Sequence, residues 1–176
     1  MKLDLSGIAV LVIDDNAHMR SLFRAILSGF GIRRVFEAAD GADGLAVILD
    51  RQPDVVICDW LMAPVSGADF LSLLRRDTND GLAMTPVIMV SADARKPVIL
   101  RAVKLGIHEF LAKPISPALL YQRLQRVVTE NRAFLRCGEA VHPVPRAAMP
   151  APGRGMSLAP PSGGAAPSAQ DAAVFI

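Results

Sequence analysis

Three runs of consecutive apolar residues constrain the fold of this chain most strongly, because each stops abruptly at a polar residue. The runs and the residues that follow them are Ile8–Ile13 with Asp14, Val55–Cys58 with Asp59, and Val87–Val90 with Ser91. Strands without polar alternation are typical of a parallel sheet covered on both faces. Ligands bind at the carboxyl edge of such a sheet. A lone carboxylate at that edge, such as Asp59, is therefore a candidate functional residue.

Helical periodicity between the apolar runs predicts an alternating order of strands and helices. The expected strands are Ile8–Ile13, Arg33–Ala38, Val55–Asp59, Pro86–Ser91 and Ile107–Leu111. Helices are expected after a cap at Asp15 or Asn16, over Gly41–Leu49, from Phe70 to Arg76, from Ile99 to Gly106, and from Leu119 to about Leu135, with a polar loop over Asp77–Met84. Five alternations predict an α/β domain whose parallel strands are joined by right-handed crossovers.

The composition changes after Cys137. Of the 40 residues from Cys137 to Ile176, 25 are Gly, Ala, Ser or Pro. Such a segment has little apolar surface to bury, which predicts a folded domain over residues 1–136 and a disordered tail over residues 137–176. The apolar end, Val174-Phe175-Ile176, is either a frayed terminus or a short docking motif.

Charge and cysteine content narrow the class of protein. A net charge of +2 is too small to indicate nucleic-acid or membrane binding. The two cysteines, Cys58 and Cys137, lie in no metal-binding motif, so we expect a buried Cys58 and a reducing, cytoplasmic environment. The N-terminus does not resemble a signal peptide, and no apolar run reaches the roughly 20 residues that a membrane span needs.

Polar residues at the strand ends form the candidate site. Asp14, Asp15, Asp59 and Ser91 should share one sheet edge with Lys113, which follows the fifth expected strand. Three neighbouring carboxylates need a cation, and hard oxygen ligands suit Mg²⁺. An aspartate can accept a phosphoryl group, and lysine and serine can hold its oxygens. Phosphoryl transfer depends mainly on such positioning and charge neutralisation.

Each of these residues also has a simpler interpretation. The aspartates could cap helices or turns, Ser91 could be a turn hydroxyl, and Lys113 could be a solvated side chain before Pro114. Their joint occurrence at successive strand ends favours the functional interpretation.

These motifs together resemble the response-regulator receiver domain, the phosphoacceptor of two-component signalling. The matching residues are the acidic pair Asp14-Asp15, the phosphorylated Asp59, the turn glycine Gly67, the hydroxyl residue Ser91 before Ala92, the switch aromatic Phe110, and Lys113-Pro114 with its cis bond. The resemblance covers residues from about 6 to 135. It implies a flavodoxin-like (βα)5 fold, a doubly wound five-stranded parallel sheet in the order 2-1-3-4-5.

The resemblance also implies roles for individual residues. Asp59 would be the phosphoacceptor, assisted by Ser91 and Lys113; Ser91 and Phe110 would switch conformation; and Mg²⁺ would be held by Asp14, Asp15, Asp59 and the backbone carbonyl of Leu61. The implied phosphodonor is a histidine kinase or histidine phosphotransfer protein. His18 and Arg20, which we expect to be exposed beside the acidic pocket, are either candidates for contact with the kinase or ordinary surface residues. The implied protein is not an enzyme in its own right, although it assists its own phosphorylation and dephosphorylation.

The expected output is protein–protein interaction by a stand-alone receiver, since the tail is too short and too polar for a DNA-binding or enzymatic domain. We therefore expect an unknown downstream protein, no direct nucleic-acid contact and no membrane. Two alternatives remain: a phosphorylation-independent scaffold with the same fold, and a haloacid-dehalogenase-like phosphatase. The phosphatase is disfavoured because Leu61 stands where its second aspartate belongs.

Two departures from the family pattern concern the loop after Asp59 and the lifetime of the phosphate. Ala63 precedes Pro64 where the family usually has Met-Pro directly, so the loop shape is expected to differ. Positions that tune phosphate lifetime hold Leu61 and Asp93. Leu61 has no polar group to orient a water molecule, so we expect modestly slow self-hydrolysis.

Overall fold

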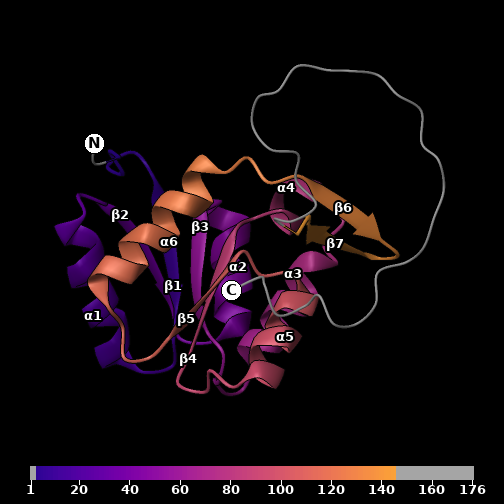
Figure 1. The fold of residues 1–176 in the computed structure, drawn as a ribbon, viewed down its shortest axis with the longest axis horizontal. Coiled ribbons are helices and arrows are strands. Elements are labelled where there is room, and N and C mark those ends of the chain that lie inside the picture. The colour runs from indigo at the N-terminus through magenta and orange to yellow at the C-terminus, as the bar shows by residue number, and fades with distance from the viewer. Residues whose placement is uncertain (1–2, 146–176) are drawn as a thin grey trace. The chain divides into compact units, whose positions relative to one another are not determined.

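Five parallel strands in the order β2-β1-β3-β4-β5 form the central sheet of the computed structural model, which describes residues 3–145. In that order the strands are Arg34–Ala38, Ala9–Ile13, Val55–Asp59, Val87–Ser91 and Glu109–Ala112. The helices are α1 (Ala17–Gly29), α2 (Gly41–Arg51), α3 (Gly67–Arg75), α4 (Asp80–Ala83), α5 (Lys96–Leu105) and α6 (Pro117–Thr129). The expected flavodoxin-like sheet order is confirmed (Figure 1).

Two apolar clusters cover the two faces of the sheet. On β1, Val10 and Val12 face the cluster built with Phe23 of α1 and Leu120 and Leu124 of α6. Leu11 and Ile13 face the opposite cluster, which is built mainly with residues of α2, α3 and α5. Burial on both sides explains why the strands read as unbroken apolar runs. Every residue of β1, β3 and β4 is buried, so these strands rigidly position the residues that follow them.

Every described helix except α5 starts after a residue whose side chain caps it. The side chain of Asn16 accepts hydrogen bonds from the backbone N–H groups of His18 and Met19, which decides between the two expected caps of α1. Ser66 and Ser116 cap α3 and α6 in the same way. α1 ends at Gly29, and Gly31 follows with a positive φ of 86°.

The chain after α6 differs from the expectation. The helix expected to reach about Leu135 ends at Thr129, and an antiparallel hairpin follows, made of β6 (Phe134–Cys137) and β7 (Ala140–Pro143). The compact unit accordingly extends to Pro143, across the boundary expected at residue 136. The short helix α4 also lies inside the segment expected to be a loop.

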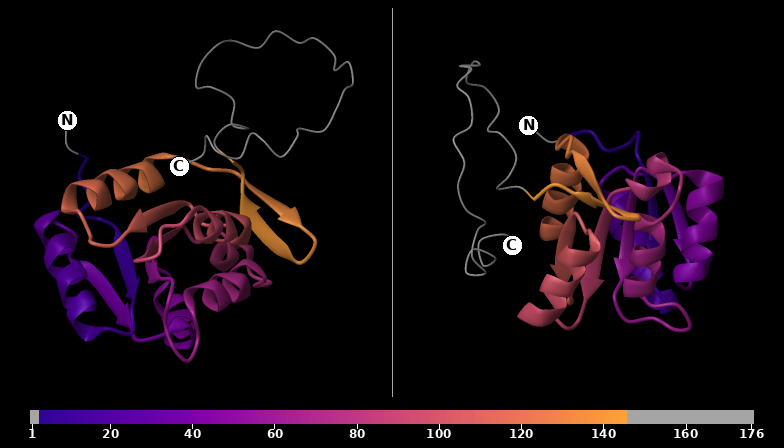
Figure 2. Two further views of the ribbon diagram at one scale, coloured as in Figure 1. Left: turned by 60° about the horizontal axis from the view of Figure 1, so that its bottom comes forward. Right: turned by 90° about the vertical axis from the view of Figure 1, so that its right-hand side faces the viewer.

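Long-range contacts account for the hairpin. β7 lies against α3 and α4, and Val141 is buried (Figure 1, Figure 2). The ring of Phe134 lies 5.6 Å from the guanidinium carbon of Arg75 and 5.3 Å from the ring of His108. The composition of this segment predicted a tail. It could not reveal the hairpin, because the residues that the hairpin packs against are distant in the sequence. The rest of the expected tail, with Val174-Phe175-Ile176, lies outside the described residues.

Arg75 joins the hairpin to the amino ends of the strands. Its side chain is 1% exposed and donates to the carbonyl oxygens of Gly106, Ala83 and Thr85 at 2.9, 2.5 and 2.9 Å. Burial lowers the pKa of Arg75 to about 9. None of helices α1 to α6 is long and apolar enough to cross a bilayer.

Candidate functional site

Three carboxylates converge at the carboxyl edge of the sheet. Asp14 and Asp15 follow β1, and Asp59 is the last residue of β3. Each offers one oxygen, and these oxygens all lie within 4.8 Å of one another. Asp14 is 1% exposed and Asp59 is 7% exposed, whereas Asp15 is open to solvent. The expected convergence of these three residues is therefore present.

Backbone contacts hold Asp59 in place. The N–H of Trp60 donates to the carbonyl oxygen of Val90 at 2.8 Å, and the N–H of Gly67 donates to the carbonyl oxygen of Trp60 at 3.1 Å. A Cβ atom on Gly67 would stand 2.2 Å from the carbonyl oxygen of Asp59. Gly67 is thus required by the close approach of α3 to the end of β3.

Lys113 supplies the cation of the site. Its Nζ lies 3.1 Å from Oδ1 of Asp59 and 3.2 Å from Oδ2 of Asp14. The backbone N–H of Lys113 donates to the carbonyl oxygen of Ser91 at 2.8 Å, which extends the pairing of β5 with β4. The Lys113–Pro114 bond is cis, as the resemblance implied.

Burial and charge shift the pKa values of the pair. Burial raises the pKa of Asp59, and the attraction of Lys113 offsets only part of that rise. Burial alone would lower the pKa of Lys113, but the neighbouring carboxylates of Asp59 and Asp14 outweigh it and raise that pKa. The site thus keeps a lysine cation beside the Asp59 carboxylate, whose pKa burial raises.

Cys58 precedes Asp59 on β3 but is not a candidate for a reactive thiol. Its side chain is fully buried, and burial followed by the charges of Asp59 and Asp14 raises the pKa of the thiol well above its ordinary value. Cys58 is therefore an apolar packing residue, as expected.

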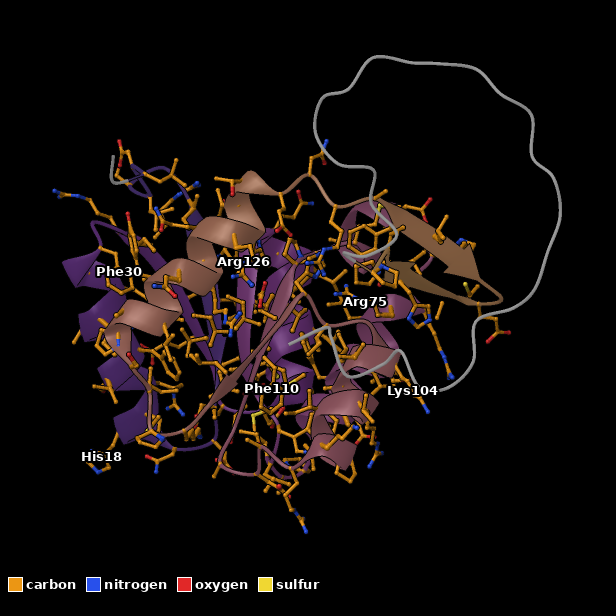
Figure 3. The ribbon with its side chains drawn as sticks, in the orientation of Figure 1. His18, Phe30, Arg75, Lys104, Phe110 and Arg126 are labelled. Atoms are coloured by element: carbon orange, nitrogen blue, oxygen red, sulfur yellow. The ribbon has the colours of Figure 1, made fainter. Side chains whose placement is uncertain are left out.

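Ser91 and Phe110 lie on the neighbouring strands β4 and β5. Ser91 is 1% exposed, and its Oγ accepts a hydrogen bond from the N–H of Asp93 at 3.0 Å. That bond leaves the hydroxyl proton available to another acceptor. Phe110 is half-buried, pairs in register with Met89, and packs against the core (Figure 3).

The loop after Asp59 buries two apolar side chains and exposes a third. Trp60 and Met62 are buried, and the guanidinium of Arg101 on α5 lies 5.7 Å from the Trp60 ring. Leu61 is 65% exposed, which suits a role limited to its backbone. The Ala63–Pro64 bond in this loop is cis.

Other expected residues occupy different environments. Asp93 pairs with Arg95, whose Nη2 lies 2.6 Å from Asp93 Oδ2, and hydrogen bonds from Arg95 lower the pKa of Asp93 to about 2. His18 is exposed at the start of α1, as expected (Figure 3). Arg20, by contrast, is half-buried and bonded within the domain, so its expected exposure is wrong.

Comparison with known proteins identifies the family. The model of the family described as "Response regulator receiver domain" matches residues 10–125. The chain belongs to this family. The chain is 37% identical over 153 residues to protein-glutamate methylesterase/protein-glutamine glutaminase 1 of Myxococcus xanthus, covering 86% of this chain and 42% of that protein. It is 30% identical over 118 residues to chemotaxis protein CheY-3 of Vibrio cholerae, covering 67% of this chain and 89% of that protein.

Solved structures agree with this assignment. The receiver domain of the Francisella response regulator 1452 superposes with a TM-score of 0.62 at 29% identity, covering 69% of this chain and 96% of that one. Receiver domains of this kind are generally non-enzymatic signalling domains that typically bind Mg²⁺ at an acidic pocket. The chain spans less than half of the methylesterase, so that protein's activity is not transferred to it.

Proposed function

We propose that this receiver domain accepts a phosphoryl group on Asp59 from a histidine kinase or a histidine phosphotransfer protein. The observation that carries the proposal is the position of Lys113 Nζ, 3.1 Å from Asp59 and 3.2 Å from Asp14, beside the third carboxylate of Asp15. A phosphoacceptor needs this combination of a nucleophilic carboxylate, a cation and further oxygen ligands.

The transfer is a substitution at phosphorus. A lone pair of an Asp59 carboxylate oxygen forms the new O–P bond as the P–N bond of phosphohistidine breaks, and the electron pair of that bond returns to the imidazole nitrogen. Lys113 already contacts Oδ1 of Asp59, which leaves Oδ2 as the attacking oxygen. The carboxylates of Asp14, Asp15 and Asp59 fit Mg²⁺, and the family resemblance adds the Leu61 carbonyl; bound Mg²⁺ would neutralise phosphoryl charge there.

Lys113 and Ser91 would hold the transferred group. The ammonium group of Lys113 can bind one phosphoryl oxygen, and the free hydroxyl proton of Ser91 can be donated to another. Ser91 would move toward the phosphoryl group, and Phe110 on the neighbouring strand would fill the space that it leaves.

The contacts to the phosphoryl group would supply the free energy that a conformational switch requires. Moving a population from 1% to 99% active takes about 5.5 kcal/mol of differential stabilisation. Hydrogen bonds to charged groups contribute roughly 1.5–3 kcal/mol each, so two or three of them supply that amount. The altered surface around β4, β5 and their helices would then bind a downstream protein.

We further propose that the receiver acts in the cytoplasm and without an attached output domain or direct contact with DNA or membrane. The residues that the structure describes, 3–145, make up the receiver and its hairpin. The mass of the gene product purified from its source tests the absence of an output domain.

The decisive experiment is phosphorylation by a small phosphodonor. With acetyl phosphate and Mg²⁺, the intact protein should gain about 80 Da, located at Asp59 by peptide mapping, and D59N should gain nothing. Failure of the folded wild-type protein to gain this mass, under conditions that phosphorylate a known receiver, would favour the phosphorylation-independent scaffold.

A further inference from the structure

The guanidinium of Arg20 is used inside the domain and not at its surface. Its Nη1 donates to the backbone carbonyl oxygen of Asp14 at 2.7 Å, and its Nε lies 3.3 Å from Oε2 of Glu37. The side chain is 19% exposed. Arg20 stands on the first turns of α1, and Glu37 stands on β2, which pairs with β1. One planar group therefore links a helix, a strand and the turn that carries two carboxylates.

The backbone N–H groups of Asp14 and Asn16 bond to the adjoining strand and within the turn, and Lys113 Nζ bonds to Oδ2 of Asp14 at 3.2 Å. The N–H of Asp14 donates to the carbonyl oxygen of Ala38 at 3.2 Å, and Oδ1 of Asp14 accepts from the N–H of Asn16 at 2.9 Å. Arg20 adds a charged donor on the carbonyl between Asp14 and Asp15. Because that carbonyl and the N–H of Asp15 form one rigid peptide plane, holding it restrains the positions of both Cα atoms, from which the two side chains leave the backbone.

We propose that Arg20 is a positioning residue that holds the Asp14–Asp15 peptide so that the carboxylates converge on Asp59. This inference rests on the proposed function. It replaces the expectation that Arg20 contacts a kinase, and it leaves His18 as the exposed candidate for that contact.

The sign of the effect on Mg²⁺ affinity separates positioning from simple charge. Arg20 is a cation near three carboxylates, so losing its charge alone should strengthen the binding of Mg²⁺. Losing the hydrogen bond from Arg20 to the carbonyl oxygen of Asp14 should instead weaken the binding of Mg²⁺. Arg24 provides the matched control, because its Nε donates to Oε1 of the same Glu37 at 2.7 Å, but its side chain does not bond to Asp14 and is 61% exposed.

The test compares R20Q, R24Q and H18A with the wild-type protein. Trp60, the only tryptophan, adjoins Asp59 and reports Mg²⁺ titrations by its fluorescence. R20Q should bind Mg²⁺ about 10-fold more weakly, at the lower end of the losses seen when outer partners of metal ligands are removed. R24Q and H18A should bind it as the wild type does. R20Q should also react more slowly with acetyl phosphate, a donor that involves no kinase contact.

A second readout needs neither metal nor phosphate. In Mg²⁺-free buffer, the amide of Asn16 should exchange its hydrogen faster in R20Q than in R24Q, because the turn that it closes is looser. Unchanged exchange in R20Q, or Mg²⁺ affinity equal to or tighter than that of the wild type, would overturn the role of Arg20. A wild-type protein that binds no Mg²⁺ and accepts no phosphate would instead overturn the proposed function. The comparison of hydrogen exchange in R20Q and R24Q would still test the role of Arg20.

Discussion

Gly67 lies so close to Asp59 that a Cβ atom added to it would stand 2.2 Å from the Asp59 carbonyl oxygen and 3.0 Å from the Cα of Trp60. Both contacts are with backbone, which cannot move aside as a flexible side chain can. The start of α3 and the end of β3 therefore fit together only when residue 67 has no side chain.

Replacing Gly67 by alanine should destabilise the domain and disturb the site. We expect G67A to lower the free energy of unfolding by about 1–3 kcal/mol, the usual cost of overpacking, and to slow phosphorylation by acetyl phosphate. Denaturant unfolding and the phosphorylation rate measure the two effects. G29A is the control, since nothing lies within 4 Å of the added Cβ. Equal stabilities of G67A and G29A would contradict the proposed fit.

Removing the lysine cation should strengthen metal binding while impairing phosphorylation. Lys113 competes with a divalent cation for Asp59 and Asp14, so K113M should bind Mg²⁺ more tightly than the wild type. It should nevertheless accept phosphate more slowly, because a donor to the phosphoryl oxygens is lost. Trp60 fluorescence and mass spectrometry measure these quantities, and K104M, which removes an exposed lysine of α5, is the control. Weaker Mg²⁺ binding by K113M would argue against the competition.

Asp59 should make the stability of the domain depend on pH in a predictable direction. Its pKa is raised in the folded state, mainly by burial, so the folded protein binds this proton more readily than the unfolded chain. The associated stability is complete below the pKa of an unfolded aspartate, about 3.9, and is lost as the pH rises through the folded pKa. D59N has no carboxylate at this position, so its stability does not fall in this way as the pH rises. Without Mg²⁺, its stability relative to the wild type should therefore be greater at pH 7 than at pH 3.5.

Denaturant unfolding of both proteins across that range measures the difference. A D59N advantage that shrinks toward neutral pH would show that Asp59 is not destabilised by its burial.

The hairpin should contribute to the stability of the receiver. F134A removes the ring over Arg75 and beside His108, and we expect it to cost about 1–3 kcal/mol, combining lost apolar burial with a lost cation–π contact. L135A changes the neighbouring side chain, which is 59% exposed, and should stay within about 0.5 kcal/mol of the wild type. Equal effects of the two substitutions would show that the hairpin merely rests on the surface.

The strands of the sheet and the main residues of the site were predictable because both depend on local patterns, whereas the order of the strands was expected from the family resemblance. Unbroken apolar runs identify strands covered on both faces, and the topology then brings Asp14, Asp59, Ser91 and Lys113 to one edge. The residue that ends each run is readable from the sequence without any knowledge of tertiary contacts.

Arg20 and the hairpin were missed because their partners leave no local mark. The acceptor of Arg20 is a backbone carbonyl, which every residue carries, so no side-chain pattern reveals it. Phe134 precedes an Ala- and Pro-rich stretch and owes its position to Arg75, which is distant in sequence. An arginine at the end of an apolar helical face, where a solvated residue is expected, was the available signal for this buried cation.

The hairpin also decides where the polypeptide leaves the receiver. β7 lies against α3 and α4, near the carbonyl groups of Ala83, Thr85 and Gly106 that precede β4 and β5, whereas Asp59 stands where β3 finishes. Anything covalently joined to Pro143 is therefore attached at the end of the sheet opposite Asp59. A reporter protein fused there would leave the approach of a phosphodonor to Asp59 free of the junction.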